Sequence, residues 1–291
     1  TDTEFEAFIL ECHLIKKWKP LFNKKMKSSL SYTYIVIHLD EKLHKMELTN
    51  DSIKKKGKHY FGPFISKHSV EKALLALKET HKILCSNPTK KNSACLNYSL
   101  NLCIGTCIGG SATEKHNKVI AKIIDLLSGN DTSLLEEMKH QMTAAAESYD
   151  FEGAAKLKDQ IDAISFLIKK EKVIEFIEEN KNIVMIEFLS ETICKLFVIK
   201  RNKILYREKI AFDSVQLEQV SSTVKIYLEN ATTQGHTEVS KDELDESEII
   251  YSYLTNSQCR YVVIPENGIN SNDHIKNVLT QLIFKKEESP R

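Results

Sequence analysis

Four cysteines within 23 residues restrict the fold of this chain more than any other feature, because a shared metal would tie together the segments that carry them. They are Cys85, Cys95, Cys103 and Cys107. In a reduced compartment clustered thiols are typical of metal ligands rather than disulfides. Structural zinc sites use paired cysteines two to four residues apart, and only the last pair approaches that spacing. Four thiolates suit a [4Fe–4S] cluster equally well, so the spacing leaves both metals open, with isolated buried thiols as the alternative.

The remaining three cysteines, Cys12, Cys194 and Cys259, are scattered along the chain. A single thiol behaves as a small apolar residue and is among the side chains most often buried. We therefore expect these three to be core residues and not ligands.

The composition is that of a soluble globular protein: 42% of the 291 residues are hydrophobic and 28% are charged. A chain of this length forms two or three domains. No apolar run approaches the roughly 18 residues that span a bilayer, and no secretory signal opens the sequence. We therefore expect a cytoplasmic protein without a membrane partner.

The net charge of +1 hides an uneven distribution, because residues 1–110 contain 18 lysines and only 10 acidic residues. A basic half that also carries the cysteines predicts a polyanionic partner; a solvated surface is the alternative. The densest basic cluster, and the best candidate for phosphate contacts, consists of Lys16, Lys17, Lys19, Lys24, Lys25 and Lys27.

The apolar spacing in the first 110 residues predicts a helix that ends before Pro20 and then strands over 32–39 and 44–48. Gly62-Pro63 predicts a turn, and residues 67–84 form a clear amphipathic pattern. From about residue 113 helical spacing dominates: Gly129 predicts the end of a first helix, and two further helices meet near Tyr149-Asp150.

After Lys181 the pattern changes to three strand-like runs at hairpin spacing, followed by further helices and the buried-strand pattern "RYVVIPE". Alternating strands and helices predict an α/β unit over residues 181–291. The whole chain is thus expected to be an α+β multidomain protein.

Several of these segments resemble UvrC, the nuclease subunit of bacterial nucleotide excision repair. The first is "TEFEAFILECHLIKKWKPLFN", which is similar to the closing helix of the GIY-YIG nuclease domain of that family. "SYTYIVI", "YFGPF" and "ACLNYSLNLCIGTCIGG" follow in the order found in UvrC, and "MTAAAESYDFEGAAKLKDQIDAI" resembles the UVR motif shared by UvrB and UvrC. The resemblance runs unbroken to about residue 170, and the tail is more weakly similar to the region that precedes the RNase H-like domain.

The resemblance implies four parts. Residues 1–34 would be the end of a GIY-YIG nuclease domain, and residues 35–110 a strand and helix segment with the cysteine site. Residues 111–180 would be a helical region with the UVR motif at about 133–168, and residues 181–291 an α/β connector.

The resemblance also decides between the metals in favour of a [4Fe–4S] cluster on the four cysteines, with zinc as the alternative. It implies a divalent ion, Mg²⁺ or Mn²⁺, held by Glu11, with Asn23 in a supporting position. Glu11 follows Leu10 and lies one turn from Phe8, so a carboxylate there would border an apolar face. Glu6, earlier in the same helix, is expected to be structural.

In the family the GIY and YIG strands precede this helix. No glycine occurs before Gly57 and no arginine before Arg201, so we expect those strands to lie before residue 1. The chain by itself is therefore expected not to cut DNA.

The family implies that the UVR hairpin docks on UvrB through residues around its aromatic anchor, Phe151, with Ala154, Ala155 and Leu157 beside it. Packing of these residues in an internal core is the alternative. The expected function is incision of damaged DNA together with UvrB, the 3′ cut being made by the GIY-YIG domain. The rivals are a Cho-type homologue that makes only the 3′ cut and a non-catalytic adaptor that binds UvrB.

Overall fold

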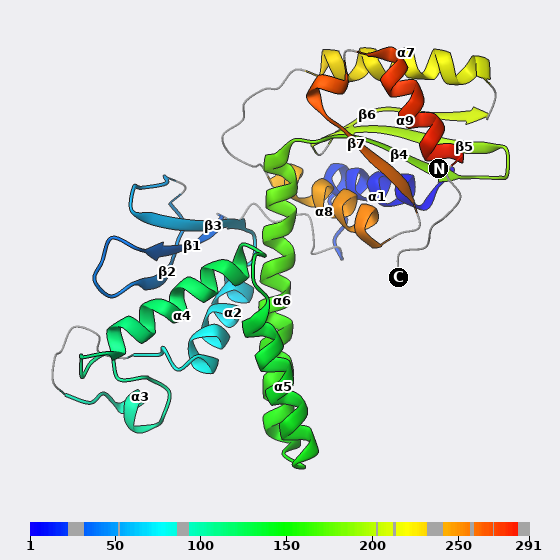
Figure 1. Ribbon diagram of the computed structural model, residues 1–291. Coiled ribbons are helices and arrows are strands. Elements are labelled where there is room, and N and C mark those ends of the chain that lie inside the picture. Colours follow the sequence, from blue (N-terminus) through cyan, green and yellow to red (C-terminus); the bar gives the residue numbers. More distant parts are fainter. Residues whose placement is uncertain are drawn as a thin grey trace. The chain divides into compact units, whose positions relative to one another are not determined.

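The computed structural model describes residues 1–22, 32–51, 53–85, 93–201, 203–211, 214–231, 241–256, 259–269 and 271–284 (Figure 1). The chain forms two compact units. One is the continuous segment Leu30–Lys172, and the other joins Thr1–Ser29 to Val173–Arg291. Each unit has its own sheet.

The sheet of the Leu30–Lys172 unit has the strand order β2-β1-β3, and all its pairings are antiparallel. The strands are β1 (Thr33–His38), β2 (Lys45–Thr49) and β3 (Lys58–Phe64). Every residue of the central strand β1 is buried, which fits the β-branched and aromatic residues at its first five positions. The strands predicted over 32–39 and 44–48 are confirmed.

The turn predicted at Gly62-Pro63 is wrong, because both residues lie within β3. Proline cannot donate a backbone hydrogen bond, and it is therefore confined to edge strands and bulges. The outer position of β3 and a register shift in its pairing with β1 meet that condition.

Within the described part of this segment the strands are followed by the helices α2 (Lys67–Thr80), α3 (Leu96–Ser99), α4 (Ala112–Leu127), α5 (Ser133–Glu147) and α6 (Phe151–Glu179). Ser66 starts α2 by accepting a hydrogen bond from the backbone N–H of Ser69. Gly129 follows α4 with a φ of 73°, so the predicted glycine stop is confirmed. Helix α6 continues beyond Lys172 into the second unit.

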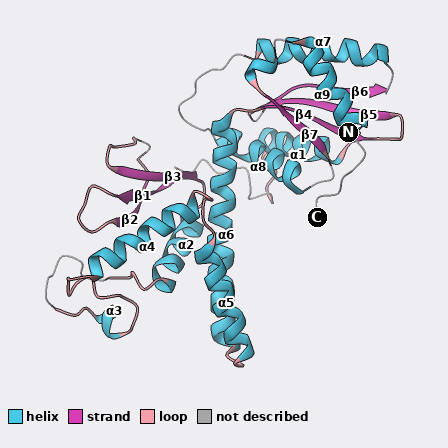
Figure 2. Cartoon of the chain, in the orientation of Figure 1, coloured by secondary structure: helices cyan, strands magenta, loops and turns pink. Residues whose placement is uncertain are grey.

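The second unit is a sheet with helices on both faces. Its antiparallel strand order is β6-β5-β4-β7, from β4 (Asn182–Phe188), β5 (Ile193–Lys200), β6 (Lys203–Ala211) and β7 (Arg260–Ile264). Helices α7 (Ser214–Asn230) and α9 (Asn272–Phe284) cover one face, and α1 (Glu4–Trp18) and α8 (Lys241–Asn256) cover the other (Figure 2). A short 3₁₀ turn, η1, spans Glu266–Gly268.

Alternate residues of β4 enter the two cores of this unit. Val184 and Ile186 pack with α7 and α9, whereas Ile183 and Met185 pack with α1 and α8. Side chains of a strand alternate between faces, so a strand with helices on both sides must be apolar at every position. Helix α1 thus shares one compact unit with the C-terminal strands. The division into four domains with boundaries near residues 34, 110 and 180 stays a prediction.

Candidate functional site

The cysteine segment is held against the end of α2 by backbone hydrogen bonds. Leu84 donates to the carbonyl of Leu102 at 3.2 Å, and Ile104 donates to the carbonyl of Lys82 at 2.8 Å. Ile83 and Cys103 form an isolated antiparallel bridge. Two stretches about twenty residues apart in sequence thereby run side by side, which places Cys85 next to the later cysteines.

The four predicted thiols gather in one cluster. The Sγ atoms of Cys85, Cys95 and Cys107 all lie within 4.8 Å of one another. Cys103 belongs to the same cluster, and its Sγ accepts a hydrogen bond from the backbone N–H of Gly105 at 3.3 Å. Cys95, Cys103 and Cys107 are buried and Cys85 is partly buried, and none forms a disulfide.

This donor set fits a metal that prefers sulfur ligands. Three thiols lie within mutual ligand range, the fourth lies beside them, and a backbone N–H already points at one sulfur. Hydrogen bonds to ligand sulfurs are typical of iron–sulfur sites, where they tune the cluster. Thiolate ligands serve zinc equally, so the geometry supports a metal centre without selecting the metal.

The loop of the last two cysteines depends on Gly105, which has a φ of +90°. A Cβ at this position would lie 3.0 Å from the ring of Tyr98 in α3. Both the left-handed backbone and the close ring favour glycine there. Gly105 thus allows the tight turn between Cys103 and Cys107 to lie close to α3.

Two of the three isolated cysteines are core residues as predicted, whereas Cys259 is only partly buried and packs against the core beside α1 and α8. Cys12 and Cys194 are fully buried in the second unit. Burial raises the pKa of the Cys194 thiol to about 12 and raises that of Cys12 as well. A thiol that stays protonated near neutral pH is neither a nucleophile nor a ready metal ligand.

The predicted functional residues of helix α1 differ in their exposure to solvent. Glu11 is exposed to solvent, as are Lys17 and Lys19. Lys16 instead forms an ion pair with Glu246 of α8, with its Nζ 3.1 Å from the carboxylate oxygen. Asn23, Lys24, Lys25 and Lys27 lie outside the described residues.

Glu6 is buried, which agrees with the structural role expected for it. It accepts a hydrogen bond from the backbone N–H of Asp2 at 2.9 Å and lies 3.2 Å from Nζ of Lys195 in β5. Burial alone would raise the pKa of the Glu6 carboxyl, but these two partners and Arg207 together lower it. Lys195 also pairs with Asp2, so the start of α1 is fastened to the sheet by charge. Sequence reasoning missed this network, because its members are almost 200 residues apart.

The helical hairpin of α5 and α6 is exposed where its two helices meet. Tyr149 takes a φ of 63° in the turn, and Asp150 accepts a hydrogen bond from the N–H of Gly153 at 2.9 Å. The side chain of Phe151 is 66% exposed and that of Tyr149 is 82% exposed. Of the predicted neighbours, Ala155 is exposed, and Ala154 and Leu157 are half-buried. Phe151 therefore does not lie in an internal core and is accessible to a partner, whereas Leu134, Met138 and Ile164 of the same two helices are buried.

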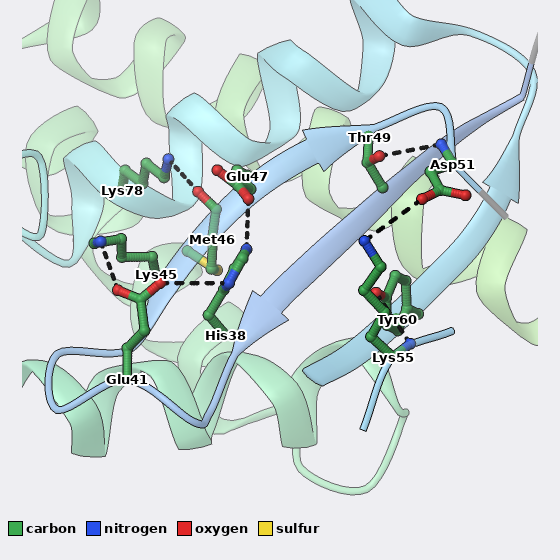
Figure 3. Close-up of polar contacts among 10 residues, drawn as sticks. All are labelled: His38, Glu41, Lys45, Met46, Glu47, Thr49, Asp51, Lys55, Tyr60 and Lys78. Carbon is green, nitrogen blue, oxygen red and sulfur yellow. Dashed lines mark hydrogen bonds and ion pairs between the residues drawn. The ribbon is translucent and has the colours of Figure 1, made fainter. Parts of the chain in front are cut away.

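A second polar cluster lies on the β1–β2 hairpin, where sequence analysis predicted nothing (Figure 3). Nε2 of His38 lies 2.5 Å from a carboxylate oxygen of Glu47, and Nδ1 lies 3.5 Å from one of Glu41. Glu41 in turn pairs with Lys45. Lys78 of α2 donates to the carbonyl of Met46 at 3.0 Å, and burial lowers the pKa of its ammonium group. These contacts tie the hairpin together and attach it to α2.

Two family models match this chain. Residues 32–126 match the UvrC/Cho excinuclease middle domain, and residues 132–165 match the UvrB/uvrC motif. The first covers the small sheet and the cysteine cluster, and the second covers the exposed hairpin.

Curated relatives match over nearly the whole chain. A protein of Clostridium perfringens (strain SM101 / Type A) named UvrABC system protein C is 30% identical over 296 residues, which is 95% of this chain and 47% of that protein. Its namesake in Acetivibrio thermocellus is 28% identical over 281 residues, or 92% of this chain and 45% of that protein. The chain thus spans about half the length of these relatives. No solved structure matches it, and among the described residues no helix is long and apolar enough to cross a membrane.

Proposed function

Because this chain is a homologue of UvrC along most of its length, we propose that it is part of an excinuclease subunit that incises damaged DNA together with UvrB in nucleotide excision repair. The observation that carries the proposal is the exposed helical hairpin in a segment that matches the UvrB/uvrC motif. Two neighbouring aromatic side chains exposed at its turn, Tyr149 and Phe151, support a docking role.

The hairpin is the contact to UvrB in this proposal. Phe151 is the central aromatic anchor, and Ala154, Ala155 and Leu157 form the close-packed surface around it. Small residues let a second helical pair approach closely, and a buried aromatic contributes most of the binding energy of such an interface. Docking brings the nuclease to damage that UvrB has already engaged.

The cysteine cluster is a structural metal centre in this proposal. Cys85, Cys95, Cys103 and Cys107 hold a [4Fe–4S] cluster, with zinc as the alternative. A metal held by these four thiols would fasten the segment after α2 to the loop that precedes α4. Removal of the metal is therefore expected to loosen this segment and to leave the core of the strands intact.

The nuclease site in this proposal includes Glu11, which holds a divalent metal ion, with Asn23 nearby. Mg²⁺ or Mn²⁺ at such a site polarises the scissile phosphate and neutralises the leaving oxygen. The exposure of Glu11 supports this role, because a ligand must reach the phosphate. Lys17 and Lys19 are exposed and would contact the DNA backbone with the other lysines of that cluster.

A binding titration of the 291-residue chain against UvrB tests the proposal. Isothermal titration calorimetry is expected to give a 1:1 complex with UvrB, and no complex with UvrB that lacks its own UvrB/uvrC motif. Equal binding to both forms of UvrB, or binding to neither, contradicts the proposed function.

A further inference from the structure

One thiol of the cysteine cluster, that of Cys103, is positioned by contacts of its own. Three Sγ atoms lie within 4.8 Å of one another, and they belong to Cys85, Cys95 and Cys107. The Sγ of Cys103 belongs to the same cluster but not to this mutual group. Its place therefore depends on the turn in which it lies.

The turn after Cys103 brings two polar groups to its sulfur. The backbone N–H of Gly105 donates to Sγ at 3.3 Å. Oγ1 of Thr106 lies 3.8 Å from the same atom, which is within hydrogen-bond range for sulfur. The N–H of Ile108 donates to the carbonyl of Gly105 at 2.9 Å and closes the turn. The backbone thus holds the Thr106 side chain beside Cys103.

The hydroxyl of Thr106 lies in a part of the loop that is closed to solvent, because Thr106, Cys103 and Cys107 are all buried. A buried hydroxyl is unfavourable unless it forms a hydrogen bond. Within the described part of the chain, the hydrogen bond of Thr106 Oγ1 is the one to Cys103. A neutral thiol is a weak partner for it, whereas an anionic acceptor forms a stronger, charge-assisted bond. Threonine is therefore most favourable here when Cys103 is a thiolate, the form that binds a metal.

Metal binding would also fix the direction of this hydrogen bond. A thiolate has no proton to donate, so the hydroxyl of Thr106 must be the donor. Hydrogen bonds to ligand sulfurs withdraw charge from them and tune the metal centre. The low polarity of a buried site strengthens such a bond.

We propose that Thr106 is a positioning residue of the metal centre, whose hydroxyl donates to the Cys103 thiolate together with the N–H of Gly105 and stabilises the metal-bound form. The inference rests on the proposed function, because it requires metal binding by the four cysteines. It adds to that function a residue outside the ligand set.

A titration with Co²⁺ tests this role whichever metal the chain carries, because thiolate ligands give this ion a sulfur-to-metal charge-transfer band. The 291-residue chain is stripped of metal and titrated under anaerobic conditions. Thr106→Val keeps the shape of the side chain and removes the hydroxyl. It should weaken Co²⁺ binding about tenfold, the lower end of the range for residues that support metal ligands. The band should move to longer wavelength, because a sulfur without this donor releases an electron more readily.

Two further variants separate the hydroxyl from packing. Thr106→Ser keeps the hydroxyl and should retain both the affinity and the position of the band. Thr33→Val is the matched control in the same compact unit, because Thr33 is buried and its Oγ1 has no hydrogen-bond partner among the described residues. This control should bind Co²⁺ with the affinity and spectrum of the unchanged chain.

Unchanged affinity or an unmoved band in Thr106→Val overturns the inference. An equal loss of affinity in Thr106→Ser also overturns it, in favour of a packing role, as does an equal loss in Thr33→Val. Thermal melts of the metal-free chains accompany the titration, and a Tm lowered only in Thr106→Val would likewise indicate packing.

Metal binding and UvrB binding separate this inference from the proposed function. If the unchanged chain binds Co²⁺ and UvrB but Thr106→Val binds Co²⁺ equally well, only the assignment of Thr106 fails. If Thr106→Val weakens Co²⁺ binding as expected but the chain does not bind UvrB, the assignment stands and the proposed function fails. If the unchanged chain binds no Co²⁺, the metal centre and this inference fail together.

Discussion

Truncation of Phe151 to alanine is expected to weaken the complex with UvrB and to leave the free chain folded. Phe151 is the first residue of α6, and its ring meets only the edge of Tyr149 among the described aromatic rings, at a centroid distance of 6.2 Å and an interplanar angle of 81°. Because two thirds of the side chain already faces the solvent, its removal leaves no cavity in the free protein. The cost should therefore fall on binding.

The size of the effect follows from the exposed area. A phenylalanine buries about 150–250 Å² when it is fully covered, and two thirds of the middle of that range is about 130 Å². At about 25 cal/mol per Å² this corresponds to about 3 kcal/mol. Ordering of the side chain in the interface reduces the gain, so we expect a loss of about 2–3 kcal/mol, which raises the Kd about 30- to 150-fold.

Calorimetric titration of the variant against UvrB measures this loss, and a thermal melt of the free variant checks its fold. The control is Phe166→Ala, which makes the same truncation about four turns further along α6. Phe166 is 40% exposed and lies below Nζ of Lys170, 5.4 Å from the ring centroid. An unchanged Kd for Phe151→Ala, or an equal rise for Phe166→Ala, refutes the docking argument, and a large drop in Tm would place Phe151 in a core.

Three further predictions concern the packing of the core, the metal content of the chain and the loss of stability at low pH. Phe5 is fully buried with its ring 5.0 Å from that of Phe197, so Phe5→Ala should lower the free energy of unfolding of its unit by about 3–5 kcal/mol in urea; a loss below about 1 kcal/mol would contradict the packing described. Cys107→Ser should remove most of the metal found by elemental analysis after anaerobic purification, whereas Cys194→Ser should not, and one zinc per chain in place of iron would rule out the cluster. Hydrogen bonds and attraction from Lys209 and Lys195 lower the pKa of Asp2 from 3.8 to about 2. Its contribution to stability is thus present above pH 4 and disappears as the pH falls to 2, and Asp2→Asn should flatten the dependence of Tm on pH across that window; an unaltered profile would exclude the contribution.

The helices were predictable from local pattern, because apolar spacing and end signals act within a few residues. The glycine stop after α4 at Gly129 is one example. The interruption between α5 and α6 at Tyr149-Asp150 is another, where a left-handed residue and an aspartate cap occur together. Both were correct because a helix closes its hydrogen bonds within its own segment.

The strands were less predictable, because a strand depends on partners elsewhere in the chain. Gly62-Pro63 has the local chemistry of a turn, yet it lies in β3, where an edge position makes the missing N–H harmless. The run "RYVVI" predicted a fully buried strand, whereas β7 is an edge strand with Tyr261 and Val263 partly exposed. Local sequence does not contain the strand order that decides such cases.

The sequence by itself indicated a site shared by four closely spaced thiols, with isolated buried thiols as the alternative, and two amphipathic helices that form a hairpin around residue 150. Only the tertiary structure decided which side chains remain available at these places. It left Phe151 in solvent, paired Lys16 with Glu246 and buried Glu6 against Lys195. It also brought His13 next to the edge of β6. The reason is physical: the spacing of residues along the chain limits which groups can meet locally, but exposure and charge pairing depend on which surfaces fold against each other.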